Sequence, residues 1–312
     1  MTNRHIAALR PIFHPPFSTT DRIKLYRLIC GAVMAGVAVT CFLKACTARC
    51  GVIMPMKTDS GQKCTGPRLH VKADLALGET VALGRDQVNY LVNVLRLKPG
   101  AAVLAFNGRH GEWLCEIEPA GRKDVVLRGL RQVRTQSPAG DLHYLFAPLK
   151  SARLDYMAQK AVEMGASLLQ PVLTRRTQVS RVNTERLSAN AVEAAEQCGI
   201  LSVPPVAVEM KLEPALSVLA PNRLLIFCDE DADVANPAEA LRPFRVMDGA
   251  GRPLALIIGP EGGFDEAERR LILARPHTVR LSLGPRILRA DTAAVAALAI
   301  VQTILGDWGN GP

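Results

Sequence analysis

The chain has 312 residues, which is about the length of two globular domains. Hydrophobic residues make up 48% of the chain and charged residues 21%, which excludes a wholly disordered, collagen-like or coiled-coil protein. The eight cysteines are too few and too irregularly spaced for a domain held together by disulfides.

The net charge of +9 is unevenly distributed along the chain. Residues 1–66 carry a net charge of +7 and residues 67–140 one of +4, whereas residues 141–312 carry −2. We therefore expect a polyanionic ligand to bind to the first part of the chain. An ordinary solvated surface explains the charge of residues 67–140 equally well.

Residues 1–66 differ from the rest of the chain and are interpreted as an atypical extension. Five cysteines lie here: Cys30, Cys41, Cys46, Cys50 and Cys64. The run of 16 uncharged, mostly apolar residues at 28–43 is shorter than the roughly 20 residues of a membrane span. The favoured explanation is a start codon assigned upstream of the real one, which would lie near Met54, Met56 or just after. A disordered or targeting extension and a membrane anchor are the alternatives.

Residues 67–140 are predicted to form a small β-barrel domain. Short β-favouring runs, at 68–71, 80–83, 102–106, 112–117 and 124–130, are separated by turn signals. Residues 86–97 have the apolar spacing of a helix. Arg68, Arg96, Lys98 and Arg109 are candidate contacts to RNA phosphates, with a solvated surface as the alternative. Phe106 and Trp113 would either stack on bases or, as is commoner, belong to the core.

Residues 141–312 are predicted to form an α/β domain with a parallel sheet and helices on both faces. The predicted strands are 142–147, 168–173, 224–228, 254–258 and 279–283, and the predicted helices are 153–165, 184–199, 265–274 and 292–305. Gly165 and Gly199 stand where a helix C-terminal glycine belongs.

A glycine-rich loop, Ile258-Gly259-Pro260-Glu261-Gly262-Gly263-Phe264, directly follows one of these strands. Its three glycines permit positive φ angles and a close approach of the backbone to a ligand. Asp265 and Glu268 have the spacing of a capping box for the next helix. The loop matches neither the Rossmann nor the Walker pattern. Taken alone, it is equally typical of a plain tight turn.

A second loop, Leu283-Gly284-Pro285-Arg286-Ile287-Leu288-Arg289-Ala290-Asp291-Thr292, also follows a strand. Residues 293–301 are apolar on all sides, which predicts a helix buried within the domain or at a subunit interface. The two arginines before that helix are costly unless they face a ligand or an acid. Both loops stand at the C-terminal ends of strands, where open α/β sheets bind their ligands.

At these two loops the sequence resembles the SPOUT methyltransferases, and more narrowly the RsmE-type enzymes, which methylate N3 of a uridine in 16S ribosomal RNA. The matching segments are IGPEGGF (258–264) and LGPRILRADTA (283–293), with support from KSARLDYMAQKAVEMGA (150–166), AVEAAEQCG (191–199) and LKPGAAVLAFNGRHGEW (97–113). The resemblance covers about residues 67–308. The sequence departs from the family at Asp291, which is usually Glu, at Ile200, which is commonly Arg, and in the loop 174–177.

The resemblance implies an α/β fold in which a trefoil-knotted SPOUT methyltransferase domain (141–312) follows a PUA-like β-barrel (67–140). It implies that S-adenosylmethionine (SAM) is the methyl donor and that 16S rRNA or the small ribosomal subunit is the partner. It also implies a homodimer in the cytoplasm, with the active site at the subunit interface.

The SAM pocket is then expected to consist of Ile258, Gly259, Pro260, Glu261, Gly262, Gly263, Leu283, Gly284, Ile287, Leu288, Arg289 and Ala290. Further RNA contacts are expected at Lys150, Arg175, Arg176 and Arg286. We expect no membrane partner. We expect no metal either, because no two of the six histidines have the spacing of metal ligands.

Methylation of uridine at N3 requires removal of the N3 proton, because the protonated nitrogen is a poor nucleophile. Arg289 is expected to stabilise negative charge on a uracil oxygen, and Asp291 or Glu261 to accept the proton. A helix N-cap is the alternative for Asp291, and the two roles are compatible. Hydrogen bonds to loop amides are the alternative for Glu261.

Two helix motifs and two cysteines have simpler interpretations. Lys160 and Glu163 would form a local ion pair, or else contact RNA or another subunit. Glu193 and Gln197 would be surface residues, although both fall inside the family motif. Cys198 and Cys228 are predicted to be small buried hydrophobic residues.

Other functions remain compatible with this sequence. One is a SPOUT methyltransferase that acts on tRNA or another rRNA site, since RNA choice would depend on the barrel rather than on the pocket loops. Another is a catalytically silent RNA-binding factor in ribosome assembly, against which the intact loops argue. A membrane-tethered protein that uses residues 28–43 is the third.

Overall fold

The computed structural model describes residues 56–57, 63–120, 124–179, 181–233, 236–245 and 251–309. The apolar run at 28–43 and the cysteines at 30, 41, 46 and 50 lie outside the described residues, so the interpretations of the extension stay predictions. Cys64 is described and is buried. Within the described ranges, no helix is long and apolar enough to cross a membrane.

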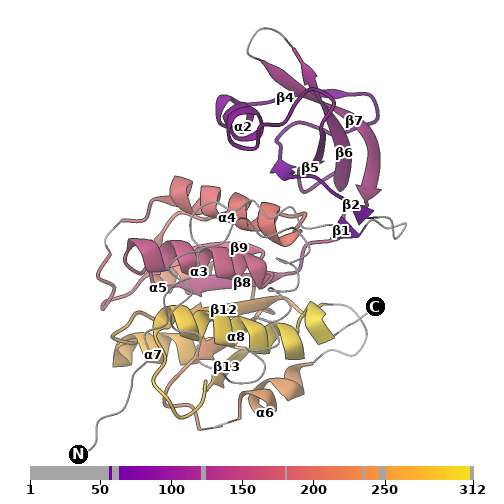
Figure 1. Cartoon of the computed structure of the whole chain (residues 1–312). Coiled ribbons are helices and arrows are strands. Elements are labelled where there is room, and N and C mark those ends of the chain that lie inside the picture. Colours follow the sequence, from indigo (N-terminus) through magenta and orange to yellow (C-terminus); the bar gives the residue numbers. More distant parts are fainter. Residues whose placement is uncertain are drawn as a thin grey trace, which may run out of the picture. The chain divides into compact units, whose positions relative to one another are not determined.

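The small β domain contains a mixed sheet of five strands (Figure 1). In spatial order these are β3 (Arg68–His70), β5 (Ala102–Phe106), β6 (Glu112–Pro119), β7 (Val125–Arg134) and β4 (Thr80–Ala82). β3 pairs with β5 in parallel and the other pairs are antiparallel. Leu69, Val103 and Leu127 belong to its buried core. A separate pair of short strands, β1 (Met56–Lys57) and β2 (Lys63–Cys64), precedes the sheet.

The predicted helix at 86–97 takes a different form. Its first turn is α2 (Arg85–Val88), and the next segment is a π-helix, η1 (Asn89–Val94), in which Leu95 N–H donates to the Tyr90 carbonyl at 2.9 Å. The wider turn places Leu91 in the core with no exposed surface. Arg96 then adopts a left-handed conformation (φ 55°), which ends the helix before residue 97.

The α/β domain is built on a sheet of six parallel strands. In spatial order these are β10 (Met210–Lys211), β9 (Leu168–Leu173), β8 (Leu142–Phe146), β12 (Leu254–Ile258), β11 (Leu224–Cys228) and β13 (Thr278–Leu281). The predicted parallel sheet is therefore confirmed. The two-residue strand β10 was not predicted, because it is too short to show a pattern.

Helices cover both faces of this sheet, as predicted (Figure 1). One face carries α3 (Ser151–Glu163), α4 (Thr184–Cys198), α6 (Pro237–Leu241) and α8 (Ala290–Ile304). The other carries α5 (Leu212–Ser217) and α7 (Glu266–Leu273). Two short 3₁₀ turns, η2 (Arg242–Phe244) and η3 (Asp307–Gly309), complete the elements. Helices α5 and α6 were not predicted from the sequence, because they have only six and five residues.

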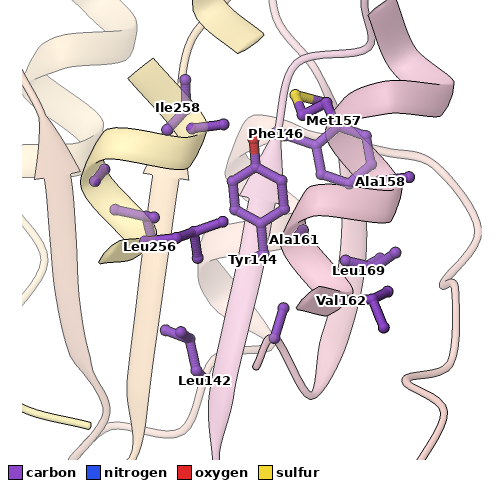
Figure 2. Packing of buried hydrophobic residues seen from close by; sticks show 14 of the residues in the cluster. Leu142, Tyr144, Phe146, Met157, Ala158, Ala161, Val162, Leu169, Leu256 and Ile258 are labelled. Atoms are coloured by element: carbon purple, nitrogen blue, oxygen red, sulfur yellow. The ribbon is translucent and has the colours of Figure 1, made fainter. Parts of the chain in front are cut away.

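Side chains that alternate along β8 show how the two faces arise. Tyr144 and Phe146 point to the α3 side, where their stacked rings lie 5.1 Å apart and pack with Met157 and Ala161 (Figure 2). Leu145, between them, belongs to the core on the opposite face. The predicted class, an α/β domain preceded by a small β domain, is confirmed. The exact domain boundaries and the trefoil knot stay predictions.

Candidate functional site

A pocket of about 610 Å³ lies at the C-terminal ends of β11, β12 and β13, which are adjacent in the sheet. The loops after these three strands line it, together with Arg153 of α3, Arg269 of α7 and the start of α8. Of the predicted pocket residues, Ile258, Gly259, Pro260, Glu261, Gly263, Leu283, Gly284, Ile287, Leu288, Arg289 and Ala290 lie on its wall. Gly262 does not, because its α-carbon faces the side chain of Arg176.

The loop after β12 needs its glycines for two different reasons. A Cβ on Gly259 would lie 2.7 Å from the ring of Phe264, which packs edge-to-face on Phe227 with centroids 5.5 Å apart. Gly263 adopts a positive φ of 68°. The three glycines were expected to permit positive φ angles and a close approach to a ligand; Gly259 and Gly262 do not adopt a positive φ. At Gly259 the side chain is excluded by close packing instead.

The loop after β13 presents exposed side chains at the pocket. Arg286 and Arg289 are both exposed, and Ile287 is 96% exposed. Gly284 has a φ of 95°, which only glycine adopts without strain. The two arginines avoid the cost of burial because the loop carries them at the pocket wall and not in the core.

Asp291 occupies a different place from the one expected. Helix α8 begins at Ala290 and its N-cap is Arg289, so the alternative that made Asp291 the N-cap is wrong. The Asp291 carboxylate accepts a hydrogen bond from Thr292 N–H at 3.0 Å in the first turn. Asp291 is not among the residues that line the pocket.

An acidic wall after β11 was missed by the sequence analysis as part of the site. Asp229 is 4% exposed, and its carboxylate accepts from Arg269 Nη2 at 3.1 Å and Arg280 Nε at 2.7 Å. Glu230 beside it is exposed and lines the pocket. The available signal was an acidic run directly after a buried strand. Its two arginine partners follow about forty and fifty residues later, where no local pattern connects them.

Glu261 forms an ion pair with Arg153, another lining residue that the sequence did not indicate. Its side chain is 51% exposed and that of Arg153 41% exposed. The alternative expected for Glu261, a bond to loop amides, is therefore replaced by a contact with α3. This ion pair connects the start of α3 to the loop after β12.

The predicted RNA contacts of the α/β domain lie on neighbouring loops. Arg175 pairs with Asp265 at 2.9 Å, and Arg176 Nη1 donates to the Gly262 carbonyl at 2.5 Å. Lys150 is exposed at the N-cap of α3. The loop after β9 is thus tied to the loop after β12, which places Arg175 and Arg176 beside the glycine-rich loop.

The predicted RNA contacts of the small β domain divide into two groups. Arg96 and Lys98 are exposed, as is Arg109, which pairs with Asp74 at 2.8 Å. The prediction that Arg68 contacts RNA is wrong. It is only 8% exposed and forms a buried ion pair with Glu112, so a phosphate group cannot reach it.

The aromatic candidates and the helix pair behave as the simpler interpretations predicted. Phe106 is fully buried, and Trp113 is half-buried and packs against the β-domain core. Lys160 donates to Glu163 at 2.7 Å, which is the local ion pair. Neither aromatic residue offers an open face comparable to a base-stacking platform.

The cysteine prediction was half right. Cys228 is partly buried and packs against the core, and burial raises the pKa of its thiol to about 12. Cys198 is exposed, because it is the last residue of α4 and faces away from the core. Glu193 and Gln197 on the same helix are also exposed. Across the part of the chain that the structure describes, no group of three or more His, Cys, Asp or Glu side chains could hold a metal ion.

Comparisons with known proteins match both domains. Residues 135–302 match the RNA methyltransferase domain family, and residues 83–128 match the RNA methyltransferase PUA domain family. The ribosomal RNA small subunit methyltransferase E of Rickettsia conorii is 31% identical over 238 residues, which cover 76% of this chain and 95% of that protein. The protein of the same name from Bacillus subtilis is 26% identical, over 74% of this chain and 93% of that protein.

Solved structures agree with these matches. The chain superposes with a TM-score of 0.68 on a ribosomal RNA small subunit methyltransferase E from Neisseria gonorrhoeae bound to S-adenosyl methionine. The two are 26% identical, and the match covers 78% of this chain and 99% of that one. A putative methyltransferase from Legionella pneumophila in complex with SAM gives a TM-score of 0.65 at 27% identity, over 76% and 97% of the chains.

Proposed function

Since the chain belongs to the family of ribosomal RNA small subunit methyltransferases E, we propose that it transfers the methyl group of SAM to N3 of a uridine in 16S ribosomal RNA. The observation that carries this proposal is the pocket. The two loops that resemble the family motifs come from different strands, and they line one cavity at the edge of the sheet where α/β domains bind ligands.

The residues of the pocket fit SAM. A volume of about 610 Å³ is in the range of small-molecule sites. Ile258, Leu283 and Leu288 offer apolar surface to an adenine, and the neighbouring glycines leave backbone groups free to bind it. Glu230 offers a carboxylate to the hydroxyl or ammonium groups of the ligand. Bound SAM supplies an electrophilic methyl group on a positively charged sulfur.

Arg289 and Glu261 are the residues that we assign to the uracil. The guanidinium of Arg289 is exposed at the pocket, where it stabilises the negative charge that loss of the N3 proton leaves on a uracil oxygen. Of the two candidate bases, Glu261 lines the pocket and Asp291 does not. Arg153 holds Glu261 Oε1, which leaves Oε2 to accept the N3 proton.

The positions of the exposed cations support an RNA partner. Lys150, Arg175, Arg176 and Arg286 are exposed on the edge of the α/β domain that carries the pocket or on the loops tied to it. Together with Arg96, Lys98 and Arg109 of the β domain they are suited to phosphate groups of 16S rRNA in the small subunit. A substrate in the ribosome places the enzyme in the cytoplasm.

A homodimer is part of the same proposal. Helix α8 buries Ala294, Ala297 and Leu298, whereas Val295 is only partly buried. An apolar helix with such a second face is suited to contact another copy of the chain. Sedimentation of the purified protein tests this, because a dimer is expected and a monomer at micromolar concentration would contradict it.

The activity itself is tested by methyl transfer from labelled SAM to small ribosomal subunits that lack this modification. Mass spectrometry then locates the methyl group. N3-methyluridine in 16S rRNA is the expected product, and subunits that already carry the modification are the control. A methyl group at another position or on another RNA would replace the proposed substrate. SAM binding without any transfer would indicate an RNA-binding factor without activity.

The same assay tests the extension. The full chain and residues 67–312 are compared side by side. Equal activity is expected, because the described site draws no residue from the segment before residue 67.

A further inference from the structure

Arg68 carries a charge at a place where water does not reach it. Its side chain, at the start of β3, is 6% exposed, and its Nε donates to Glu112 Oε1 at 2.5 Å. Glu112, on β6, has no exposed surface. Arg134 on β7 approaches the other Glu112 oxygen at 3.4 Å. We call Arg68, Glu112 and Arg134 the arginine cluster.

The arginine cluster also holds the C-terminal end of α4. Arg68 donates to the carbonyl oxygens of Ala195, Glu196 and Ile200, and Arg134 donates to that of Gly199. The last carbonyls of a helix carry negative partial charge and are incompletely paired within the helix, so cations there are favourable. Here the cations come from a different domain, about 65 to 130 residues away along the chain.

Further contacts join the same two elements. His70 N–H on β3 donates to Glu196 Oε1 at 2.8 Å. The guanidinium carbon of Arg68 lies 4.3 Å from the centre of the Phe106 ring. Phe106 is a residue of the small β domain, but it belongs to the same buried cluster as Tyr144 and Leu201 of the α/β domain. The contact is therefore both polar and apolar.

We propose that the arginine cluster positions the ribosomal RNA: it fixes the small β domain on α4, so that cations of both domains contact one RNA molecule with the target base at the pocket. The inference rests on the proposed function and deepens it, since it concerns how that substrate is presented. Arg68 and Arg134 are positioning residues, because they act through the orientation of a domain and contact neither SAM nor RNA. Correct positioning of the substrate accounts for a large part of an enzyme's rate acceleration.

The variants are chosen so that the protein stays folded. Arg134→Ala removes one arginine that is 22% exposed. The double variant Arg68→Met with Glu112→Leu removes both charges of the buried pair, so neither is left unpaired. The matched control is Arg128→Ala on the same strand, whose partner Glu118, at 2.5 Å, lies within the β domain.

The experiment measures three quantities for each variant: the SAM dissociation constant, steady-state transfer to unmodified small subunits, and small-angle X-ray scattering. In both cluster variants the KM for the subunit is expected to rise about tenfold or more. Their SAM affinity and kcat are expected to stay within about twofold of the unaltered chain. Scattering is expected to show a wider range of domain arrangements, and the Arg128→Ala control is expected to match the unaltered chain in all three.

Two kinetic results would overturn the proposal, and so would unchanged scattering. One is an unchanged subunit KM in both cluster variants. The other is a parallel loss of SAM affinity, which indicates a purely structural role. Scattering does not depend on the substrate, so it separates the two hypotheses. If the unaltered chain fails to methylate small subunits, the proposed function fails, while unchanged scattering of the variants refutes the positioning role independently.

Discussion

Arg153 at the start of α3 forms an ion pair with Glu261 in the loop after β12, and both side chains line the pocket. The two residues stand more than one hundred positions apart in the chain. Both side chains are between 41% and 51% exposed, so the pair adds at most about 1 kcal/mol to stability. The main effect of the ion pair is therefore to hold the Glu261 carboxylate at the pocket.

Glu261→Gln tests that carboxylate as the proton acceptor. Because the pair is exposed, the free energy of unfolding is expected to change by less than about 1 kcal/mol. The kcat for methyl transfer is expected to fall by about 10² to 10⁴, as for loss of a general base. Glu266→Gln on α7, a residue 75% exposed and outside the pocket, is the control. A normal kcat in Glu261→Gln would show that Glu261 is not the proton acceptor and would leave Asp291 as the candidate.

Arg289→Ala tests charge stabilisation at the uracil. Removal of one donor that faces a developing anion typically lowers kcat by about 10² to 10³. We expect that loss with SAM affinity little changed, measured by single-turnover transfer and calorimetry. Arg270→Ala, on the exposed face of α7, should behave like the unaltered chain. An equal loss of SAM affinity would mean that Arg289 binds the cofactor instead.

Gly259→Ala tests the packing of the loop after β12. The added methyl group would lie 2.7 Å from the Phe264 ring, which must then move from its place against Phe227. We expect a loss of about 1 to 3 kcal/mol in unfolding free energy, together with weaker SAM binding. Gly251→Ala, which meets no atom within 4 Å, is the control and should change stability by less than about 0.5 kcal/mol.

Asp229→Asn tests the acidic wall of the pocket. The carboxylate is almost completely buried and accepts hydrogen bonds from Arg269 and Arg280. Loss of its charge is expected to cost about 2 to 3 kcal/mol of unfolding free energy, measured by urea denaturation. Asp233→Asn removes a carboxylate that also pairs with Arg280 but is 90% exposed, and it should cost less than about 1 kcal/mol. Equal losses of unfolding free energy in the two variants would show that burial does not determine how much each carboxylate stabilises the fold.

The pH dependence of stability tests the contact between β3 and α4. Burial raises the pKa of Glu196 from 4.5 to about 7, although the hydrogen bond from His70 N–H and the charge of Arg68 oppose the shift. The folded chain therefore favours the protonated carboxyl. This contribution to stability is complete below the unfolded pKa of 4.5 and is lost as the pH rises through about 7.

Urea denaturation at about pH 5 and about pH 8 measures this effect. Glu196→Gln should reduce the loss of stability between the two values. Glu185→Gln, an exposed residue in the first turn of the same helix, should leave that loss as it is in the unaltered chain. If Glu196→Gln leaves the loss undiminished, Glu196 is not the group that titrates.

Much of the fold could be read from the sequence because local patterns determine it. The strands at 168–173, 224–228 and 254–258 have the predicted bounds, since each is a short, largely apolar run in a mostly buried parallel sheet. The capping box of Asp265 and Glu268 is also present as predicted. The loops that line the pocket could be predicted because the two loop motifs together resemble those of a known family, whereas the glycines alone are equally typical of a tight turn.

Contacts between distant residues could be found only in the tertiary structure. The sequence analysis placed Arg68 with the RNA contacts, because a basic residue near a strand shows its charge but not its burial. Its partners, from Glu112 to Ile200, come together only when the small β domain meets the end of α4. Arg153 and Asp229 joined the pocket in the same way. The sequence by itself determined most of the longer strands and helices, since propensity and periodicity act over a few residues, but not the short elements β10, α5 and α6. The tertiary structure decided which charges are buried and paired, because burial depends on what packs opposite each side chain.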